Sequence, residues 1–428
     1  MIILIFTLGS RGDMQPYLAL AVGLQHAGHR VTLATSREFS ELIQAYGVGV
    51  HPVRFSVQAL MQQPETQVIM KSGNILRQFR LMREVMDKSA EAMDDFWDAA
   101  QDTDFVVQTG TGNGGAEAAS QRGLPMAMAS ALPFPPTRAF PSFFLPMRFS
   151  LGGGYNYLTH TLMHAMLWRG LGGPATNRWR ATLGLPPWRS YAHMYGSMRA
   201  AGTPWLFGYS PTVLPKPADW EDYHHVTGYW FLDAPAGWRP PTDLAHFLES
   251  GPPPVYVGFG SMSAEDPERR TRLVLRALEL SRQRGVLSTG WGGVRRLEPS
   301  PGVFFCDDVP HAWLFPRMAA VVHHGGAGTT GANLRAGVPR ILTPFAGDQA
   351  AWAEQVVKLG VGPRPAGIKK LTAEKLAQAI ETVVHDGALR ARAATLGERI
   401  RAENGVANAV DVIERHAEAF NQRLPMPA

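Results

Sequence analysis

The chain has 428 residues, of which 45% are hydrophobic and 18% are charged, and its formal net charge is +5 at pH 7. This length favours two or three domains over a single core, and the composition excludes a mostly disordered chain. The basic residues form no stripe or recognition motif, so we expect no nucleic-acid partner and at most peripheral contact with a membrane.

The first 130 residues alternate between strand and helix patterns. The strand patterns cover 1–8, 30–35, 104–108 and 125–129, and the first helical pattern covers 15–27 and ends at Gly28. This alternation predicts a doubly wound α/β domain, which we place at 1–215.

A polar turn joins the first strand to the first helix, and it reads Gly9-Ser10-Arg11-Gly12-Asp13. Ligands of doubly wound sheets collect outside the carboxyl ends of the strands, so Asp13 is a candidate catalytic group. Asp is also among the best residues at a helix N-cap, and the turn alone leaves both roles open.

Aromatic side chains are concentrated between residues 133 and 169. The candidates for binding an apolar ligand are Phe134, Phe140, Phe143, Phe144 and Tyr155. An apolar pocket and a second hydrophobic cluster around a buried helix at 155–167 explain them equally well. Residues 149–168 contain no Asp, Glu, Lys or Arg, but their three glycines, Asn156 and two histidines make them a poor transmembrane span.

The second half of the chain repeats the first pattern. A stretch rich in proline and tryptophan, 210–254, is typical of a linker, and a second doubly wound domain is predicted at 240–404. The single cysteine of the whole chain, Cys306, excludes an intramolecular disulfide framework and favours a reducing compartment, so we expect a cytoplasmic protein. The last helix, 405–420, carries one apolar face.

Residues 321–349, VVHHGGAGTTGANLRAGVPRILTPFAGDQ, contain the strongest motif. A strand at 319–322 is followed by a glycine turn and by a helix at 329–336, and the free N–H groups of such a helix start suit a diphosphate. After the next strand, Asp348 and Gln349 offer a carboxylate and an amide that suit adjacent sugar hydroxyls.

These segments closely resemble the donor-binding signature of the plant, sterol and antibiotic glycosyltransferases with the GT-B fold. The resemblance extends over nearly the whole chain through LGSRGDMQPYLALAVGL, DDVPHAWLFPRMAAVVHHGGAGTT and PFAGDQAAWAEQVVKLGVGP, and it is closest to sterol glucosyltransferases and their bacterial natural-product relatives. It implies two Rossmann-like domains that face each other across a cleft, with the first binding the acceptor and the second the nucleotide sugar. It also implies that helix 405–420 crosses back onto the first domain.

The resemblance implies an inverting transferase that moves a hexose, with UDP-glucose as the favoured donor, to a hydroxyl of a hydrophobic small molecule such as a sterol, terpenoid or polyketide. Asp13 would be the base that deprotonates the acceptor, in the Gly12-Asp13-Met14-Gln15-Pro16 context where plant relatives have His. A single displacement needs no second carboxylate for a covalent intermediate.

The donor contacts follow from the same resemblance. The diphosphate would be met by Ser10, Arg11, His324, Gly326, Gly328 and Thr329, and the sugar by Asp348 and Gln349. Ser261 ends a strand and either meets the diphosphate or caps a helix, and Trp291 either stacks near the base or fills core volume. Val309 and His311 align with a plant stretch whose backbone reads the uracil edge, but Asp308 replaces the plant Trp.

We expect neither a cofactor nor a metal ion. Asp102-Thr103-Asp104 matches a manganese-binding pattern of other glycosyltransferases, yet it begins a strand, at the wrong end for ligands in this topology. We interpret it as a solvated turn.

Two other functions remain as alternatives, namely a UDP-sugar 2-epimerase of the same architecture and a non-catalytic accessory protein that binds nucleotide sugars. The turn at 9–13 and the aromatic stretch argue against the epimerase, and the combination of Asp13 with Asp348 and Gln349 argues against loss of activity. The sequence leaves open the acceptor, the choice between UDP and TDP, and the oligomeric state.

Overall fold

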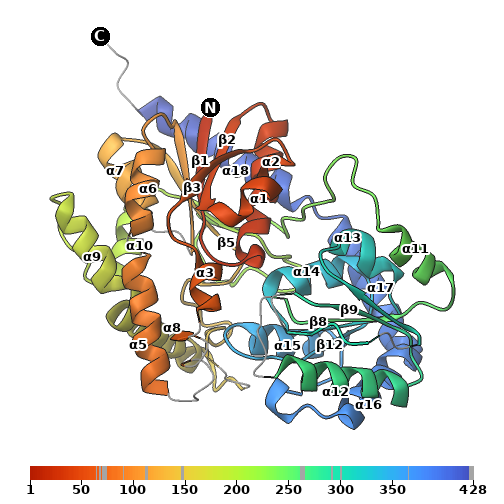
Figure 1. The fold of residues 1–428 in the computed structure, drawn as a ribbon. Helices are drawn as coiled ribbons and strands as arrows, with labels where there is room; N and C mark the ends of the chain where they lie inside the picture. Colours follow the sequence, from red (N-terminus) through yellow and green to blue (C-terminus); the bar gives the residue numbers. More distant parts are fainter. Residues whose placement is uncertain are drawn as a thin grey trace.

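The computed structural model describes residues 1–63, 65–66, 69, 75–89, 91–110, 114–145, 149–260, 266–290, 293–298, 301–364 and 366–423. It has two parallel sheets, each with helices on both faces (Figure 1). The two sheets with their helices form two Rossmann-like α/β domains, as the sequence predicts.

The first sheet has the strand order β3-β2-β1-β4-β5-β6-β7 and is parallel throughout. Its strands are β1 (Ile2–Phe6), β2 (Arg30–Ser36), β3 (Gly49–Val53), β4 (Phe105–Thr109), β5 (Met126–Ser130), β6 (Trp205–Phe207) and β7 (His224–Val226). The direction of winding reverses between β1 and β4, which places a ligand crevice outside the carboxyl ends of these strands. The turn that contains Asp13 follows β1 at this position.

Helices cover both faces of this sheet, so its central strands are continuous apolar runs. The helices of this domain are α1 (Arg11–His26), α2 (Ser40–Gln44), α3 (Val57–Gln62), α5 (Ile75–Lys88), α6 (Glu91–Ala99), α7 (Gly115–Arg122), α8 (Gly153–Leu167), α9 (Gly173–Thr182) and α10 (Tyr191–Ala200). Ile3 and Ile5 are buried toward α1, whereas Phe6 stacks on Phe96 of α6 with a centroid distance of 4.7 Å. Each such fully buried side chain contributes about 1.5 to 3 kcal/mol.

The second sheet has the order β10-β9-β8-β11-β12 and is also parallel. Its strands are β8 (Val255–Gly258), β9 (Gly285–Ser288), β10 (Val303–Cys306), β11 (Ala320–His323) and β12 (Arg340–Leu342). Its helices are α11 (Thr242–Glu249), α12 (Pro267–Leu280), α13 (His311–Leu314), α14 (Ala327–Ala336), α15 (Gln349–Lys358), α16 (Ala373–His385) and α17 (Gly387–Arg401).

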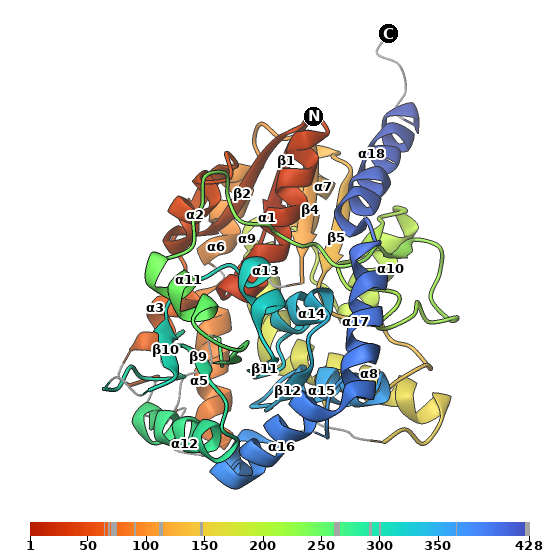
Figure 2. The same ribbon diagram turned by 90° about the vertical axis from the view of Figure 1, so that its right-hand side faces the viewer.

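The last helix, α18 (Gly405–Arg423), returns to the first domain and packs against α1 (Figure 2). Ala409, Ile413 and Ala417 join the core that contains Ile3 and Leu24. A side chain at Gly23 of α1 would collide with Val406, so this glycine permits the close approach of the two helices. The final helix therefore completes a core that the first residues begin.

Helix α1 starts earlier than the sequence pattern predicts. It begins at Arg11, and Pro16 lies inside it. Ser10 is the N-cap and Asp13 is three residues on, so the pair forms a capping box that starts the helix ahead of the proline. The proline has no N–H, which leaves the Gly12 carbonyl without its helical donor.

Candidate active site

The first turns of α1 and α14 lie side by side, although they belong to different domains. Each helix begins directly after the carboxyl end of a central strand, β1 or β11. A Cβ atom at Gly328 would lie 3.8 Å from the Gly12 carbonyl oxygen. The two predicted halves of the site therefore face each other.

Asp13 is held by the capping box at the start of α1. The Ser10 N–H and hydroxyl both donate to Asp13 Oδ2 at 2.8 Å. The carboxylate leans over Gly9, where a Cβ atom would lie 2.5 Å from Oδ2 and where φ is +128°. Asp13 therefore caps its helix with Oδ2, and among the described residues no donor bonds its other oxygen, Oδ1.

The pKa of Asp13 is raised, chiefly because the surrounding protein disfavours the charged form, while the two Ser10 hydrogen bonds act in the opposite direction. The side chain nevertheless remains accessible to solvent. A raised pKa together with access from outside is what a general base requires.

His324 lies buried between two glycines of the second domain. A Cβ atom added at Gly260 would lie 2.9 Å from the His324 ring, and one added at Gly326 would lie 2.5 Å from His324 Nε2. Burial lowers the pKa of His324 to about 4, so the ring is neutral at pH 7. Its Nδ1 is buried without a partner among the described residues. A neutral ring can accept or donate a hydrogen bond at this atom.

The start of α14 offers unpaired backbone donors beside His324. Its N-cap is Gly326, which has no side chain to cap the helix, and the first helical bond runs from the Thr330 N–H to the Gly326 carbonyl. The N–H groups of Ala327, Gly328 and Thr329 therefore have no helical acceptor, and such N–H groups at the positive end of a helix suit an anion.

Asp348 and Gln349 start α15 but serve different purposes. Asp348 Oδ2 accepts a hydrogen bond from Trp352 Nε1 at 2.9 Å. Burial raises the pKa of Asp348 to about 6, and the charge of Asp13 acts in the same direction. Gln349 Oε1 instead accepts the Phe345 N–H at 2.7 Å, so it shapes the loop before α15. Its predicted contact with a sugar stays a prediction.

Arg11 connects the two domains by an ion pair with Asp308, which follows β10. His311 begins α13 and stacks on Phe315 with a centroid distance of 4.2 Å. Burial and the nearby Arg11 charge lower the pKa of His311 to about 4. The Val309 side chain belongs to a hydrophobic core, which leaves its backbone as the part able to meet a ligand.

Ser261 and Trp291 lie outside the described residues. Asp104 accepts the Ile2 N–H at 2.7 Å and thus lies at the amino end of β1, opposite the site. The Asp-x-Asp pattern at 102–104 therefore lies at the amino end of the sheet, whereas Asp13 follows its carboxyl end, where ligands of this topology bind.

The five aromatic residues predicted to bind the acceptor do not line a single pocket. Phe143 packs edge-on against Trp352 at 5.0 Å, which brings it next to the residue that holds Asp348, and Phe140 contacts Phe143. Phe134 stacks on His164 and contacts Phe144 within a side-chain cluster. Tyr155 stacks on Phe149 at 6.1 Å. The structure connects only Phe143 and Phe140 to the site, and an acceptor role for all five stays a prediction.

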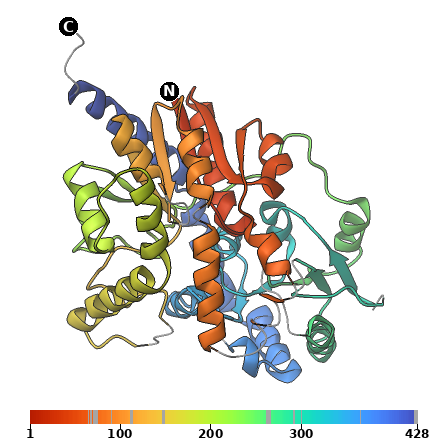
Figure 3. The ribbon, with the colours of Figure 1, turned by 60° about the vertical axis from the view of Figure 1, so that its left-hand side comes forward.

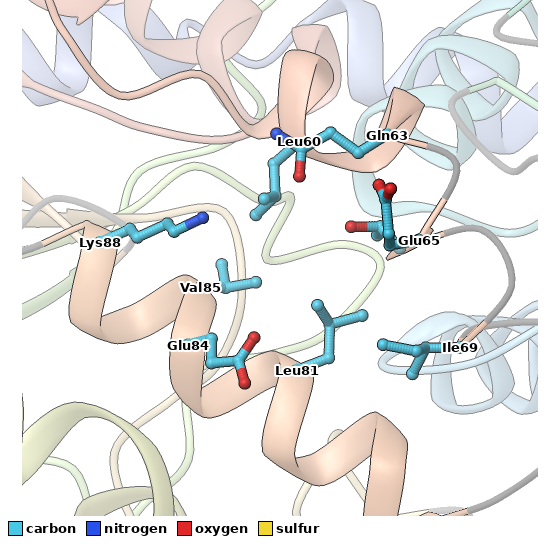
Figure 4. Close-up of a pocket in the computed structure, with 9 residues that line it drawn as sticks. Leu60, Gln63, Glu65, Ile69, Leu81, Glu84, Val85 and Lys88 are labelled. Atoms are coloured by element: carbon cyan, nitrogen blue, oxygen red, sulfur yellow. The ribbon is translucent and has the colours of Figure 1, made fainter.

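Two features escaped the sequence patterns. Trp352 is fully buried and positions Asp348, and its spacing of four residues within one helix is the signal that could have found it. A pocket of about 90 Å³ opens between α3 and α5, where Leu60, Ile69, Leu81 and Val85 point toward one another (Figure 4). It is smaller than a typical ligand site of about 300 Å³ or more.

Comparison with known proteins gives concordant results. Residues 3–107 match the glycosyltransferase family 28 N-terminal domain, and residues 294–415 match the erythromycin biosynthesis protein CIII-like C-terminal domain. A sterol 3-beta-glucosyltransferase of Cryptococcus neoformans is 38% identical over 98% of this chain, which spans 27% of that protein. One from Emericella nidulans is 37% identical over 96% of this chain, which spans 30% of it.

Solved structures share the fold. The calicheamicin glycosyltransferase CalG4 superposes with a TM-score of 0.66 at 22% identity, covering 100% of this chain and 99% of that one. The glycotransferase of kitacinnamycin gives a TM-score of 0.68 at 20% identity, covering 97% of this chain and 98% of that one. At such identities the likeness concerns the fold alone.

Proposed function

The chain belongs to the GT-B family of glycosyltransferases, and from that premise we propose that it transfers glucose from UDP-glucose to a sterol hydroxyl with inversion at the anomeric carbon. One observation carries the proposal: the first turn of α1, which holds Asp13, lies against the uncapped start of α14 in the other domain. This arrangement supports a base from the first domain and a diphosphate site from the second, with Asp348 as the proposed sugar ligand.

The proposed reaction is one displacement. The acceptor hydroxyl gives its proton to Asp13 as its oxygen forms a bond to the anomeric carbon, and the bond from that carbon to the diphosphate oxygen breaks with its electron pair. UDP leaves, stabilised by the N–H groups of α14 and by the neutral His324 ring. Asp348 would hold the sugar hydroxyls, so the attacked carbon would lie between the two carboxylates.

Arg11 would supply the positive charge for the diphosphate. Its ion pair with Asp308 is partly exposed, with 34% of the Arg11 side chain and 69% of the Asp308 side chain accessible. Such pairs contribute at most about 1 kcal/mol, so a diphosphate can take the place of Asp308. We propose a metal-independent reaction because the N–H groups of α14, a hydrogen bond from the neutral His324 ring and the charge of Arg11 can together stabilise the leaving diphosphate.

The sterol acceptor is supported by the fungal relatives. Their likeness extends over nearly all of this chain, including both halves of the site, although this chain spans less than a third of their length. The sterol and the UDP-glucose donor are therefore proposals for this chain.

A product assay tests the proposal. The purified chain would be incubated with UDP-glucose, or with TDP-glucose, and with ergosterol or cholesterol in cyclodextrin, and the products identified by mass spectrometry and by NMR of the anomeric proton. We expect a sterol β-glucoside that still forms in EDTA. A free 2-epimerised sugar nucleotide would instead support the epimerase, and donor binding without any glycoside would support an accessory protein. Loss of activity in EDTA with recovery in Mn²⁺ would disprove metal independence.

A further inference from the structure

Helix α8 of the first domain presents a large apolar face to solvent. Within the described chain, every large hydrophobic side chain that is exposed lies on or just before this helix. These residues are Phe149, Leu151, Tyr157, Leu158, Leu162 and Met166, with exposed fractions between 45% and 71%. A contiguous group of this kind marks an interaction site, whereas isolated apolar residues do not.

The opposite face of α8 is polar and is directed into the protein. The Asn156 amide donates to the Arg138 carbonyl at 2.9 Å, and Thr159 Oγ1 accepts the Ser142 N–H at 2.9 Å. The His160 and His164 rings contact backbone carbonyls of the 134–140 loop at 3.1 Å. Burial lowers the pKa of both histidines, and for His164 it is about 4, so both rings stay neutral.

This arrangement inverts the usual surface helix, whose apolar side faces the core. Leu158, Leu162 and Met166 follow one another at intervals of four residues, so they form one stripe along the helix. Because hydrogen bonds hold the polar side, the helix cannot roll over to bury this stripe without losing them. The exposed stripe is therefore a fixed feature of the fold.

The surroundings of the stripe are basic. Residues 149–168 contain no charged residue. Exposed Arg138 lies over the Tyr157 ring at 5.6 Å, and exposed Arg169 follows the helix. Helix α5 packs against the turn after α8 (Figure 3), and its exposed basic residues, Arg77, Arg80, Arg83 and Lys88, outnumber its exposed acidic residues, Glu84 and Asp87. An apolar centre with a positive rim is complementary to a lipid bilayer with anionic headgroups.

We propose that the outer face of α8 docks this protein on an anionic membrane surface, with the helix lying in the plane of the headgroups. No helix among the described residues is long and apolar enough to cross a bilayer, so the contact is peripheral. The inference goes beyond the proposed reaction and does not depend on it, because it concerns a surface outside the site.

A second copy of the chain fits this face less well. A helix of 15 residues is about 22 Å long and about 10 Å wide. Its face thus offers about 200 Å², whereas a stable interface buries about 800 Å² on each partner. The arginines around the stripe would also face one another in a symmetric pair.

Vesicle sedimentation without donor or acceptor tests the proposal. The purified chain would be mixed with phosphatidylcholine vesicles with and without added phosphatidylglycerol. We expect binding that increases with phosphatidylglycerol and falls with salt. Leu158→Gln with Leu162→Gln should lower the partition coefficient at least tenfold on both kinds of vesicle, while Arg80→Glu with Arg83→Glu should lower it only on the anionic ones, by about fivefold per residue.

The matched control is Ala388→Gln with Ala391→Gln, which changes two exposed positions on α17 of the second domain and should leave binding unchanged. Thermal unfolding would verify that each variant is folded, and Met166→Gln offers a second, milder test of the stripe. Wild-type binding that survives in Leu158→Gln with Leu162→Gln, or no wild-type binding to either vesicle, would overturn the proposal. So would light scattering that shows a dimer which this variant dissociates. Sterol glucosylation in cyclodextrin should persist in all variants, so failure of the docking proposal and failure of the proposed function are separable.

Discussion

At the scale of single residues, the site depends on carboxylates kept in surroundings that disfavour their charge. Asp13 and Asp348 both have raised pKa values, and both depend on one neighbouring donor, Ser10 or Trp352. Raised carboxylate pKa values are more common at functional sites than at structural positions.

Asp13→Asn tests the base. The amide can still accept the Ser10 hydrogen bonds, so α1 should stay capped, but it cannot take a proton. We expect transfer to fall at least ~10²-fold while UDP affinity measured by calorimetry is nearly unchanged. If the variant transfers sugar at a near-normal rate, Asp13 is a helix cap and not the catalytic base.

Ser10→Ala tests how Asp13 is positioned. The Ser10 hydroxyl lowers the pKa of Asp13, so its removal should raise that pKa further. Since the base must be deprotonated, the acidic limb of the kcat/KM profile should move to higher pH. An unchanged limb would show that another group titrates.

Asp348→Asn tests how much the buried Asp348 carboxylate lowers the free energy of unfolding. The pKa of Asp348 rises from 3.8 to about 6 on folding, so the folded state binds more protons than the unfolded state and stability falls as pH rises between these values. The variant should therefore gain up to about 3 kcal/mol at pH 8, measured by urea unfolding, because each pKa unit corresponds to about 1.4 kcal/mol.

The same variant should bind UDP-glucose more weakly and UDP equally well. Glu398→Gln, an exposed change on α17, is the control and should change stability little at any pH. A gain in Asp348→Asn that is independent of pH would contradict the titration argument.

At the scale of elements, the junction of β11 with α14 decides donor binding. Gly326→Ala keeps an ordinary backbone angle of −61°, but its Cβ atom would lie 2.5 Å from His324 Nε2. We expect the ring to move and UDP affinity to fall at least tenfold with little change in stability. Gly387→Ala, at the start of α17, meets nothing within 4 Å and should be neutral.

This junction could be predicted from the sequence, whereas the start of α1 and the orientation of α8 could not. Gly325 has a φ of +96°, and a Cβ atom at Gly326 would lie 2.5 Å from His324 Nε2, so both positions favour glycine. The sequence pattern placed the start of α1 near Pro16, because the capping box of Ser10 and Asp13 was not weighed against the proline. The orientation of α8 depends on hydrogen bonds to loop carbonyls, which no periodicity contains.

At the scale of the whole molecule, the site exists only where two domains meet. Sequence patterns indicated each half, yet the pair of Arg11 with Asp308 and the contact of Phe143 with Trp352 depend on how the domains are placed. Such contacts join residues more than 200 positions apart, and local propensity carries no information about them.

Arg11 and Asp308 can be tested as a pair. Asp308→Ala should change the free energy of unfolding by less than about 1 kcal/mol and should tighten UDP binding, because Arg11 is then free for the diphosphate. Arg11→Ala should weaken UDP binding, and in that background Asp308→Ala should have no further effect. Asp307→Ala is the neighbouring control. Equal effects of Asp308→Ala with and without Arg11 would show that the two residues act independently.

The return of α18 to the first domain also affects how the chain is made. The core around Ile3 and Leu24 lacks Ala409, Ile413 and Ala417 until the last helix has left the ribosome. Domains generally fold as units during synthesis, starting from the N-terminus. Here the core of the first domain is completed only after the second domain has been translated. Until then, the apolar residues of α1 that α18 covers are exposed to solvent.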